Sequence, residues 1–417
     1  MRIVENVGTK VGAPWCMDSD SVYFVQVDAD KCQACGECQD VCPTGVIQPV
    51  RDDDGPRTVV SPAACVNCGQ CLINCPYGAI YEGVSFVDEV FAALKDPDKI
   101  VVSMPAPAVR FGLAEAFGQP VGTCSEGKMF AALKRLGFDR IWDNQMTADL
   151  TILEEGTELL GRLTGKIKKP LPQFTSCCPG WIKFVETFFP DMIPYLSTCK
   201  SPIGMLGALS KTYGAELTHT HPKKIYTVSI MPCIAKKFEG LRPELADSGY
   251  RDIDATITTR ELAWMIKRAG IDFNSLPEEK PEFALGESTG AAVIFGSSGG
   301  VMEAALRFAY EAVAGEKLSD PEIKAVRSYK GVKEATIPVP NFGDLNVCVI
   351  SGVANAVPVI EQIRQGKSKY HFIEVMTCPG GCVNGGGQPL MPDLRTSSLF
   401  RQIVSRMNRR FSMRKTA

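Results

Sequence analysis

Two cysteine runs with one shared spacing constrain the fold more than any other feature of the sequence. The runs begin at Cys32 and Cys65, and both read Cys-x-x-Cys-x-x-Cys-x-x-x-Cys-Pro. Four thiolates at this spacing are typical of a 4Fe-4S cluster, and in two-cluster modules the fourth cysteine of each run binds the cluster of the other run. The repeat therefore predicts one pseudo-symmetric module with two clusters, not a disulfide framework.

This crossed pattern assigns four cysteines to each cluster. One 4Fe-4S cluster takes Cys32, Cys35, Cys38 and Cys75, and the second takes Cys65, Cys68, Cys71 and Cys42. A pair of zinc sites is the alternative, but such sites use Cys-x-x-Cys pairs separated by longer gaps and do not need the proline. We expect an α+β ferredoxin-like domain over residues 1–95, with a first strand from Tyr23 to Val27 and a linker at Asp96-Pro97-Asp98.

The rest of the 417 residues is long enough for a larger domain with its own core, over residues 96–392. Short β-rich runs occur at 100–104, 225–230, 347–350 and 372–375. They alternate with helical patterns at 259–269, 301–312 and 357–365. This alternation predicts an α/β domain with two mostly parallel sheets flanked by helices, in which sites lie at the carboxyl ends of the strands.

Charge and hydropathy give little information about partners. The formal net charge of -2 gives no global reason to expect nucleic-acid binding. No run of about 18 apolar residues predicts a membrane span, and residues 1–8 lack the apolar core of a signal peptide. Residues 393–417 form a basic tail with no acidic residue after Leu394. We expect a helix there that binds a partner, touches anionic lipid, is trimmed, or simply lies on the surface.

Three further cysteine motifs lie in the larger domain. They are Thr175-Ser-Cys-Cys-Pro-Gly-Trp181, Met231-Pro-Cys-Ile-Ala-Lys-Lys237 and Met376-Thr-Cys-Pro-Gly-Gly-Cys382. Together with the N-terminal repeat, the chain resembles the FeFe hydrogenases from Tyr23 to about Pro392. The resemblance implies reversible H2 oxidation and proton reduction at an H-cluster, a 4Fe-4S cubane linked to a diiron subsite with CO, CN and a bridging dithiolate amine.

The resemblance also implies a ligand set for the H-cluster. Cys178, Cys233, Cys378 and Cys382 match the four cubane ligands, and Cys382 also bridges to the diiron subsite. Buried inert thiols are the alternative. Because Cys378 and Cys382 are four residues apart, a helical turn there would place both sulfurs on one face. The glycines at 380–381 and 385–387 suggest that backbone approaches a bulky cofactor.

Six other residues match the surroundings of the diiron subsite in the family. Lys236 matches the lysine that donates to a cyanide ligand. The matches that pack near the diiron ligands are Ala106, Pro107, Met231, Phe295 and Met376. Ordinary core packing would explain these five residues equally well.

Hydrogen turnover requires protons to reach a buried metal through closely spaced ionisable groups. The resemblance implies that Cys177 relays the proton between the bridging amine and Glu155, and that Glu158, Arg162 and Ser197 continue the route. The glutamates and Arg162 share one stripe of a predicted helix, although a pair such as Glu158 and Arg162 is also a common solvated salt bridge. Burial of Glu155 would raise its pKa and keep it able to carry a proton near neutral pH.

The type of hydrogenase follows from the segment after Gly-Gly-Gly-Gln-Pro. Single-chain members continue there with a segment that wraps the catalytic domain, and we do not recognise it here. The resemblance therefore implies the large subunit of the two-subunit periplasmic type of sulfate-reducing bacteria. Its partners would be a small subunit that carries the export signal, maturation proteins, and an electron carrier such as a cytochrome c or ferredoxin. A cytoplasmic location is the alternative.

Two rival functions belong to other classes. A non-catalytic relative, either a hydrogen sensor or an iron-sulfur assembly protein, tends to lose the relay residues or to add sensory domains, whereas Cys177, Glu155 and Glu158 are all present. A plain electron carrier would need only the first 95 residues. Infrared bands of CO and CN would discriminate both rivals, because those bands require the diiron subsite.

Overall fold

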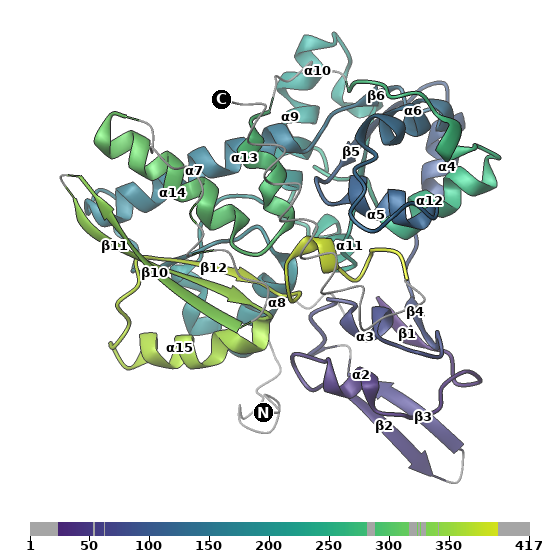
Figure 1. The fold of residues 1–417 in the computed structure, drawn as a ribbon. Helices are drawn as coiled ribbons and strands as arrows, with labels where there is room; N and C mark the ends of the chain where they lie inside the picture. The colour runs from purple at the N-terminus through teal and green to yellow at the C-terminus, as the bar shows by residue number, and fades with distance from the viewer. Residues whose placement is uncertain are drawn as a thin grey trace.

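The cysteine repeat folds into two short hairpin-like sheets with a helical turn in each run. In the computed structural model, which describes residues 24–390 except 53–54, 62, 282–287, 317–322, 324–325, 327–330 and 341, this module is the purple part of Figure 1. Strand β1 (Val25–Val27) pairs antiparallel with β4 (Ile80–Glu82), and β2 (Ile47–Asp52) pairs antiparallel with β3 (Gly55–Val60). The calls on Tyr23 and on the tail at 393–417 lie outside the described residues.

Each run places its third cysteine, Cys38 or Cys71, on a short helix. Helices α2 (Glu37–Asp40) and α3 (Gln70–Ile73) both follow a glycine in the left-handed region, Gly36 with φ 92° and Gly69 with φ 68°. Glycine adopts this conformation without the steric cost that a Cβ atom brings. The repeated glycine therefore lets both runs turn sharply and direct several sulfurs inward.

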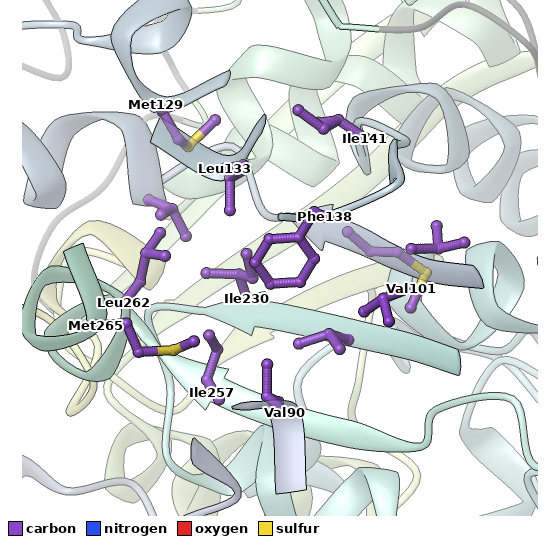
Figure 2. Packing of buried hydrophobic residues seen from close by; sticks show 14 of the residues in the cluster. Val90, Val101, Met129, Leu133, Phe138, Ile141, Ile230, Ile257, Leu262 and Met265 are labelled. Atoms are coloured by element: carbon purple, nitrogen blue, oxygen red, sulfur yellow. The ribbon is translucent and has the colours of Figure 1, made fainter. Parts of the chain in front are cut away.

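The first sheet of the larger part is wholly parallel. Its order is β6 (Arg140–Ile141), β5 (Ile100–Pro105), β8 (Ile225–Met231) and β9 (Ala255–Thr258). Helices α4 (Val87–Lys95), α5 (Val109–Ala116), α6 (Glu126–Leu136), α9 (Pro202–Lys211) and α12 (Thr259–Arg268) contribute to the core around it. Figure 2 shows part of this core, where Phe138 and Ile230 lie among side chains from α6, α12 and the strands.

Helix α4 packs with this first sheet rather than with the cysteine module. Its buried residues Val87, Val90 and Ala93 belong to the same apolar cluster as Val101 and Ile257. The helix ends at Lys95, where the linker was expected. By packing, the structural division between the two parts therefore falls between β4 and α4.

The second sheet has the order β10 (Gly331–Val339), β11 (Gly343–Ser351), β12 (Phe372–Met376) and β7 (Gln173–Phe174). β11, β12 and β7 are parallel, and β10 forms an antiparallel hairpin with β11. Val347 and Val349 pack with α7 (Gln145–Leu163) and α14 (Gly300–Ala314), while Cys348 and Ile350 pack with α8 (Pro179–Phe188) and α15 (Ala356–Arg364). Figure 1 shows these helix pairs on opposite sides of the sheet.

The observed architecture confirms the predicted α/β fold with two mostly parallel sheets behind a ferredoxin-like module. The β-rich runs did not predict β6, β7, β9 and β10. β6 and β7 have only two residues each, and most residues of β10 are exposed or half-buried, including Lys333 and Glu334. The remaining short helices are α10 (Tyr213–Leu217), α11 (Ala235–Gly240) and α13 (Gly290–Val293). Among the described residues, no helix combines the length and apolar character needed to cross a bilayer.

Candidate active site

The carboxyl ends of strands from both sheets open onto one cavity. The loop Ala106-Pro107-Ala108 follows β5, Met231 ends β8, and Met376 ends β12. The cavity, together with its opening to solvent, spans about 860 Å³ that protein atoms do not fill. All eleven H-cluster and inner-relay residues that the sequence suggested line it: Ala106, Pro107, Cys177, Cys178, Met231, Cys233, Lys236, Phe295, Met376, Cys378 and Cys382.

Four of these cysteines converge from separate loops. Cys178 precedes the first residue of α8, Cys233 lies between β8 and α11, and Cys378 follows β12. Burial raises the thiol pKa of Cys233 and Cys382 to about 12, and raises that of Cys378 well above its ordinary value. Such thiols become thiolates only beside a strong positive charge, which a bound iron cluster supplies. The donor set therefore fits an iron-sulfur cluster.

The segment from Cys378 to Cys382 is a turn, so the expected helical turn is wrong. Gly381 N donates to Cys378 O at 3.0 Å, and a 3-10 helix then begins at Cys382. Gly380 and Gly381 have φ values of 84° and 96°, which an α-helix does not accommodate. The spacing of four residues nevertheless leaves both sulfurs at the cavity.

The glycines around Cys382 approach protein backbone as well as the cavity. A Cβ atom on Gly385 would lie 2.1 Å from Pro232 O, and one on Gly386 would lie 2.3 Å from Cys68 O. Gly381 would likewise place a Cβ 2.6 Å from Ser298 N. These glycines allow three cysteine-bearing loops to pack against one another, although Gly381 and Gly385 also line the cavity.

The ferredoxin-like module forms part of the cavity wall. Cys68 lines the cavity, and its carbonyl oxygen lies 3.9 Å from Cys378 Sγ. The side chain of Gln70 donates to Asn384 O at 2.8 Å. Cys42 is among the electrostatic neighbours of Cys65, Cys68 and Cys71, as the crossed assignment requires.

The other four cysteines of the repeat form a separate hollow. Cys32, Cys35, Cys38 and Cys75 line a space of about 290 Å³ with Thr58 and Tyr77. Cys35 is exposed, whereas Cys32 and Cys38 are buried. The repeat thus brings together both expected sets of four cysteines, one beside the main cavity and one nearer the surface.

Lys236 has three polar partners around its ammonium group. Its Nζ atom lies 2.5 Å from Glu239 Oε2, and it donates to Ser201 Oγ at 2.9 Å and to Cys177 O at 3.2 Å. Burial alone would lower the pKa of Lys236, but the charge of Glu239 raises it above its usual value. The ammonium group therefore stays charged at the cavity wall.

Glu158 lies at the outer part of the expected proton route. Arg162 Nε donates to Glu158 Oε1 at 3.1 Å, and Ser197 Oγ donates to Glu158 Oε2 at 3.0 Å. Thr198 adds donations from its backbone N–H at 2.8 Å and from its hydroxyl at 3.0 Å. Burial raises the pKa of Glu158, but these donors outweigh it and leave the pKa below its ordinary value. Because both partners are buried, the pair is not a solvated surface bridge.

Glu155 lies further inward on the same face of α7. Its carboxylate Oε1 accepts from Ser176 N at 3.0 Å and from Ser176 Oγ at 3.2 Å, while Oε2 is buried without a hydrogen-bond partner among the described residues. Burial raises the pKa of Glu155 to about 7, as the sequence suggested. Ser197 also contributes to the pKa of Glu155, so this hydroxyl lies close to both glutamates.

Several residues of the site escaped the sequence reasoning. Ser176 anchors Glu155, and the signal was its position directly before Cys177. Glu239 fixes Lys236, and the signal was an acid three residues after a lysine on a short helix. Glu374 of β12 is fully buried and accepts from Gly299 N at 2.6 Å and Met302 N at 2.7 Å, which fixes the start of α14 beside Phe295. No sequence pattern pointed to Glu374.

Two family models match the chain. The model described as iron only hydrogenase large subunit, C-terminal domain, matches residues 99–386, and the 4Fe-4S dicluster domain model matches residues 31–79. The periplasmic Fe hydrogenase large subunit of Nitratidesulfovibrio vulgaris is 56% identical over 94% of this chain and 93% of that protein. Cytosolic iron-sulfur assembly component 3 of Bos taurus is 32% identical over 75% of this chain and 67% of that protein.

Solved structures lead to the same family. An apo form of FeFe hydrogenase HydA1 from Chlamydomonas reinhardtii shares 41% sequence identity, with 77% of this chain and 88% of that chain covered and a TM-score of 0.67. The family models, the identity to the N. vulgaris protein and this structural match agree with the cavity and its cysteines. The chain belongs to the FeFe hydrogenases, enzymes that carry 4Fe-4S clusters and an H-cluster.

Proposed function

We propose that this hydrogenase catalyses reversible H2 oxidation and proton reduction at an H-cluster in the cavity between the two sheets. The observation that carries the proposal is the convergence on one cavity of four cysteines, the Lys236 ammonium group and Cys177, with Glu155 and Glu158 behind Cys177. When bound, the H-cluster supplies the redox chemistry at iron. The residues of the chain hold the cluster, exclude water and deliver protons.

Holding the cluster is assigned to residues on separate loops. Cys178, Cys233, Cys378 and Cys382 bind the cubane, and Cys382 also binds the diiron subsite. Lys236, oriented by Glu239, provides positive charge for an anionic cyanide ligand. The residues Ala106, Pro107, Met231, Phe295 and Met376 form apolar walls that keep water away.

Proton delivery is assigned to a chain of groups that leads inward along α7. Glu158 is the outer acceptor, and Arg162 keeps it ionised between proton transfers. The hydroxyl of Ser197 lies between Glu158 and Glu155. With a pKa of about 7, Glu155 is able both to accept and to release a proton near neutral pH. Cys177, whose thiol burial keeps protonated, passes the proton to the H-cluster.

Electron transfer is assigned to the module in a fixed order. The cluster held by Cys42, Cys65, Cys68 and Cys71 adjoins the cavity, because Cys68 lines it. The cluster held by Cys32, Cys35, Cys38 and Cys75 is the outer one, because Cys35 is exposed. A cytochrome c or a ferredoxin then docks at the outer cluster. Residues 1–95 would thus serve electron transfer and residues 96–392 catalysis. Helix α4, although it lies before residue 96, packs as part of the catalytic domain.

The small subunit and the compartment rest on the name of the N. vulgaris protein. That relative is a periplasmic large subunit and aligns with 94% of this chain. We infer that this chain also pairs with a separate small subunit and reaches the periplasm together with it. A cytoplasmic location is the alternative, and fractionation of cells that express both subunits distinguishes the two.

A non-catalytic role is the second candidate, because an iron-sulfur assembly component is also a relative. The relay favours catalysis, since a cluster that only assembles or senses does not need a buried glutamate with a pKa of about 7 behind a cysteine thiol. The identity to the N. vulgaris hydrogenase, 56%, also exceeds the 32% identity to the assembly component.

The decisive experiment is infrared spectroscopy and iron analysis of protein matured with the hydrogenase maturation enzymes and the small subunit. We expect CO and CN bands, hydrogen turnover, and about fourteen irons per chain, from three cubanes and one diiron unit. Protein made without maturation enzymes should hold about twelve irons and be inactive. Turnover without CO and CN bands would refute the assignment.

A further inference from the structure

One polar side chain in the cavity is not explained by the functions above. Apart from cysteines, the described residues that line the cavity include only three with polar side chains, Asn144, Lys236 and Thr377. In a largely apolar pocket, the few polar groups set the orientation of the ligand. Thr377 Oγ1 already lies 3.2 Å from Cys178 Sγ, and Lys236 Nζ donates to Ser201 Oγ and Cys177 O and forms an ion pair with Glu239.

Asn144 is the polar lining residue whose side-chain amide has no role so far. The residue is 5% exposed and occupies the N-cap position of α7. Asparagine at this position usually accepts a hydrogen bond from a helix N–H through its side chain, but no such bond exists here. Instead, Thr147 Oγ1 donates to Asn144 Oδ1 at 2.9 Å. The amide oxygen is therefore occupied, and the amide nitrogen has no hydrogen-bond partner among the described residues.

The backbone also fixes this side chain at the cavity. Asn144 N donates to Pro105 O at 3.3 Å, at the end of β5, and Ala148 N donates to Asn144 O at 3.1 Å. Thr147, which orients the amide, is fully buried. A donor held between a strand end and the first turn of a helix loses little rotamer entropy when it meets an acceptor.

We propose that Asn144 Nδ2 donates a hydrogen bond to a cyanide ligand of the diiron subsite, with Thr147 as the residue that positions the amide. This inference depends on the proposed function, because it requires the H-cluster to occupy the cavity. Cyanide nitrogen is the acceptor of choice because it carries negative charge, and hydrogen bonds to charged acceptors are the stronger ones. Asn144 would thus be a neutral donor from α7, separate from the charged group on α11.

The experiment uses the matured complex with its small subunit and compares three variants by infrared spectroscopy. Asn144→Leu keeps a similar volume but removes the donor, and Asn144→Asp keeps the shape but replaces the donor with an acceptor. Both should shift at least one CN band, while the signals of the cubanes in electron paramagnetic resonance stay unchanged. Thr147→Val leaves the donor but loosens it, so its CN shift should be smaller and in the same direction as that of Asn144→Leu.

The outcomes separate this inference from the proposed function. If the parental enzyme shows CO and CN bands, and neither Asn144 variant moves a CN band, the hydrogen bond does not exist and the inference is overturned. If the parental enzyme lacks the bands altogether, the proposed function fails first. Asn144→Asp guards against misfolding of the leucine variant, since it keeps the shape of the side chain. Because a carboxylate also adds charge near the cyanide, its CN shift supports the donor only if Thr147→Val shifts the same band, and a shift confined to Asn144→Asp overturns the inference.

Discussion

Cys177 and Cys178 are neighbours in the chain, but the cavity gives them different surroundings. Cys178 caps the start of α8 and lies 3.2 Å from Thr377 Oγ1, as a loop that holds a cluster ligand requires. Burial and the negative charge of Glu155 raise the pKa of Cys177, and its carbonyl oxygen accepts a hydrogen bond from Lys236. These different contacts support the different roles proposed for the two adjacent cysteines.

Single substitutions should separate these two roles. Cys178→Ala should remove a cubane ligand and with it the H-cluster, so that CO and CN bands disappear. Cys177→Ala should leave those bands intact and reduce turnover by roughly 100-fold or more, because a general acid/base group contributes about that much. Infrared spectra and hydrogen evolution assays on the same preparations check both outcomes. Parental turnover in Cys177→Ala would mean that protons enter elsewhere.

Glu155 should also leave a signature in the pH dependence of stability. Burial raises its folded-state pKa from 4.5 to about 7, so between these values the folded protein binds more protons than the unfolded chain. Stability therefore falls as pH rises through this interval. The glutamine of Glu155→Gln cannot ionise, so the melting temperature of this variant should rise relative to that of the parent as pH rises from about 5 to 8.

Glu154 provides the matched control for this measurement. It is the exposed neighbour of Glu155 on α7, so Glu154→Gln should show a nearly constant difference from the parent over the same pH range. Thermal unfolding by circular dichroism at several pH values measures both variants. A constant difference for Glu155→Gln as well would mean that Glu155 is not desolvated.

At the scale of elements, four of the parallel strands were predictable because buried strands are continuous apolar runs. β5, β8, β11 and β12 all contain such runs. β10 was missed because its exposed polar residues interrupt any apolar run. The turn from Cys378 to Cys382 was missed because the spacing of residues in a sequence gives no information on positive φ angles. Glu374 was missed because its partners Gly299 and Met302 are distant in sequence, and a local pattern does not contain such contacts. The cysteine motifs identified the candidate ligands but not the packing that brings them together.

The turn at Gly381 is an element-scale test of that packing. A Cβ atom there would meet Ser298 N at 2.6 Å and the backbone of Ser297 at 2.8 Å, and φ is +96°. Gly381→Ala should therefore destabilise the protein by about 3–5 kcal/mol and displace Cys382. Urea unfolding measures the first effect, and loss of CN band intensity measures the second.

Gly366→Ala is the control, since Gly366 has a φ of +66° but nothing within 4 Å of a Cβ atom. It should cost only the backbone strain, about 1–2 kcal/mol, and leave the CN bands unchanged. Equal losses in the two alanine variants would show that crowding at Gly381 contributes nothing.

At the scale of the whole molecule, a buried charge cluster joins the ferredoxin-like module to the catalytic part. Lys237 Nζ lies 2.6 Å from Glu82 Oε2 on β4 and 2.8 Å from Glu261 Oε1 on α12. It also donates to Val84 O at 2.6 Å, and its side chain is fully buried. Arg260 reaches Glu82 from the other side. These contacts fix the module beside the cavity.

Lys237→Met should break this connection. The substitution removes the buried ammonium group that Glu82 and Glu261 share. The free energy of unfolding should therefore fall by about 3–5 kcal/mol. Reduction of the catalytic cubane by an external donor should also slow, since its route passes through the module. Lys31→Met, at a largely exposed lysine paired with Asp28, is the control and should leave the free energy of unfolding nearly unchanged. Urea unfolding and stopped-flow reduction check the two effects.

The contact between Gly69 and Gly386 has a consequence for protein engineering. A Cβ atom on Gly69 would lie 2.9 Å from Gly386 Cα, and one on Gly386 would lie 2.6 Å from Gly69 Cα. Backbone from the module thus touches backbone from the catalytic part, with no side chain between them to adapt. A chimera that exchanges this module for another two-cluster unit therefore needs more than a suitable junction at residues 83–99. The incoming unit must also carry a glycine at the position of Gly69. Any other residue there would push the module away from the catalytic part and lengthen the distance that electrons must cross.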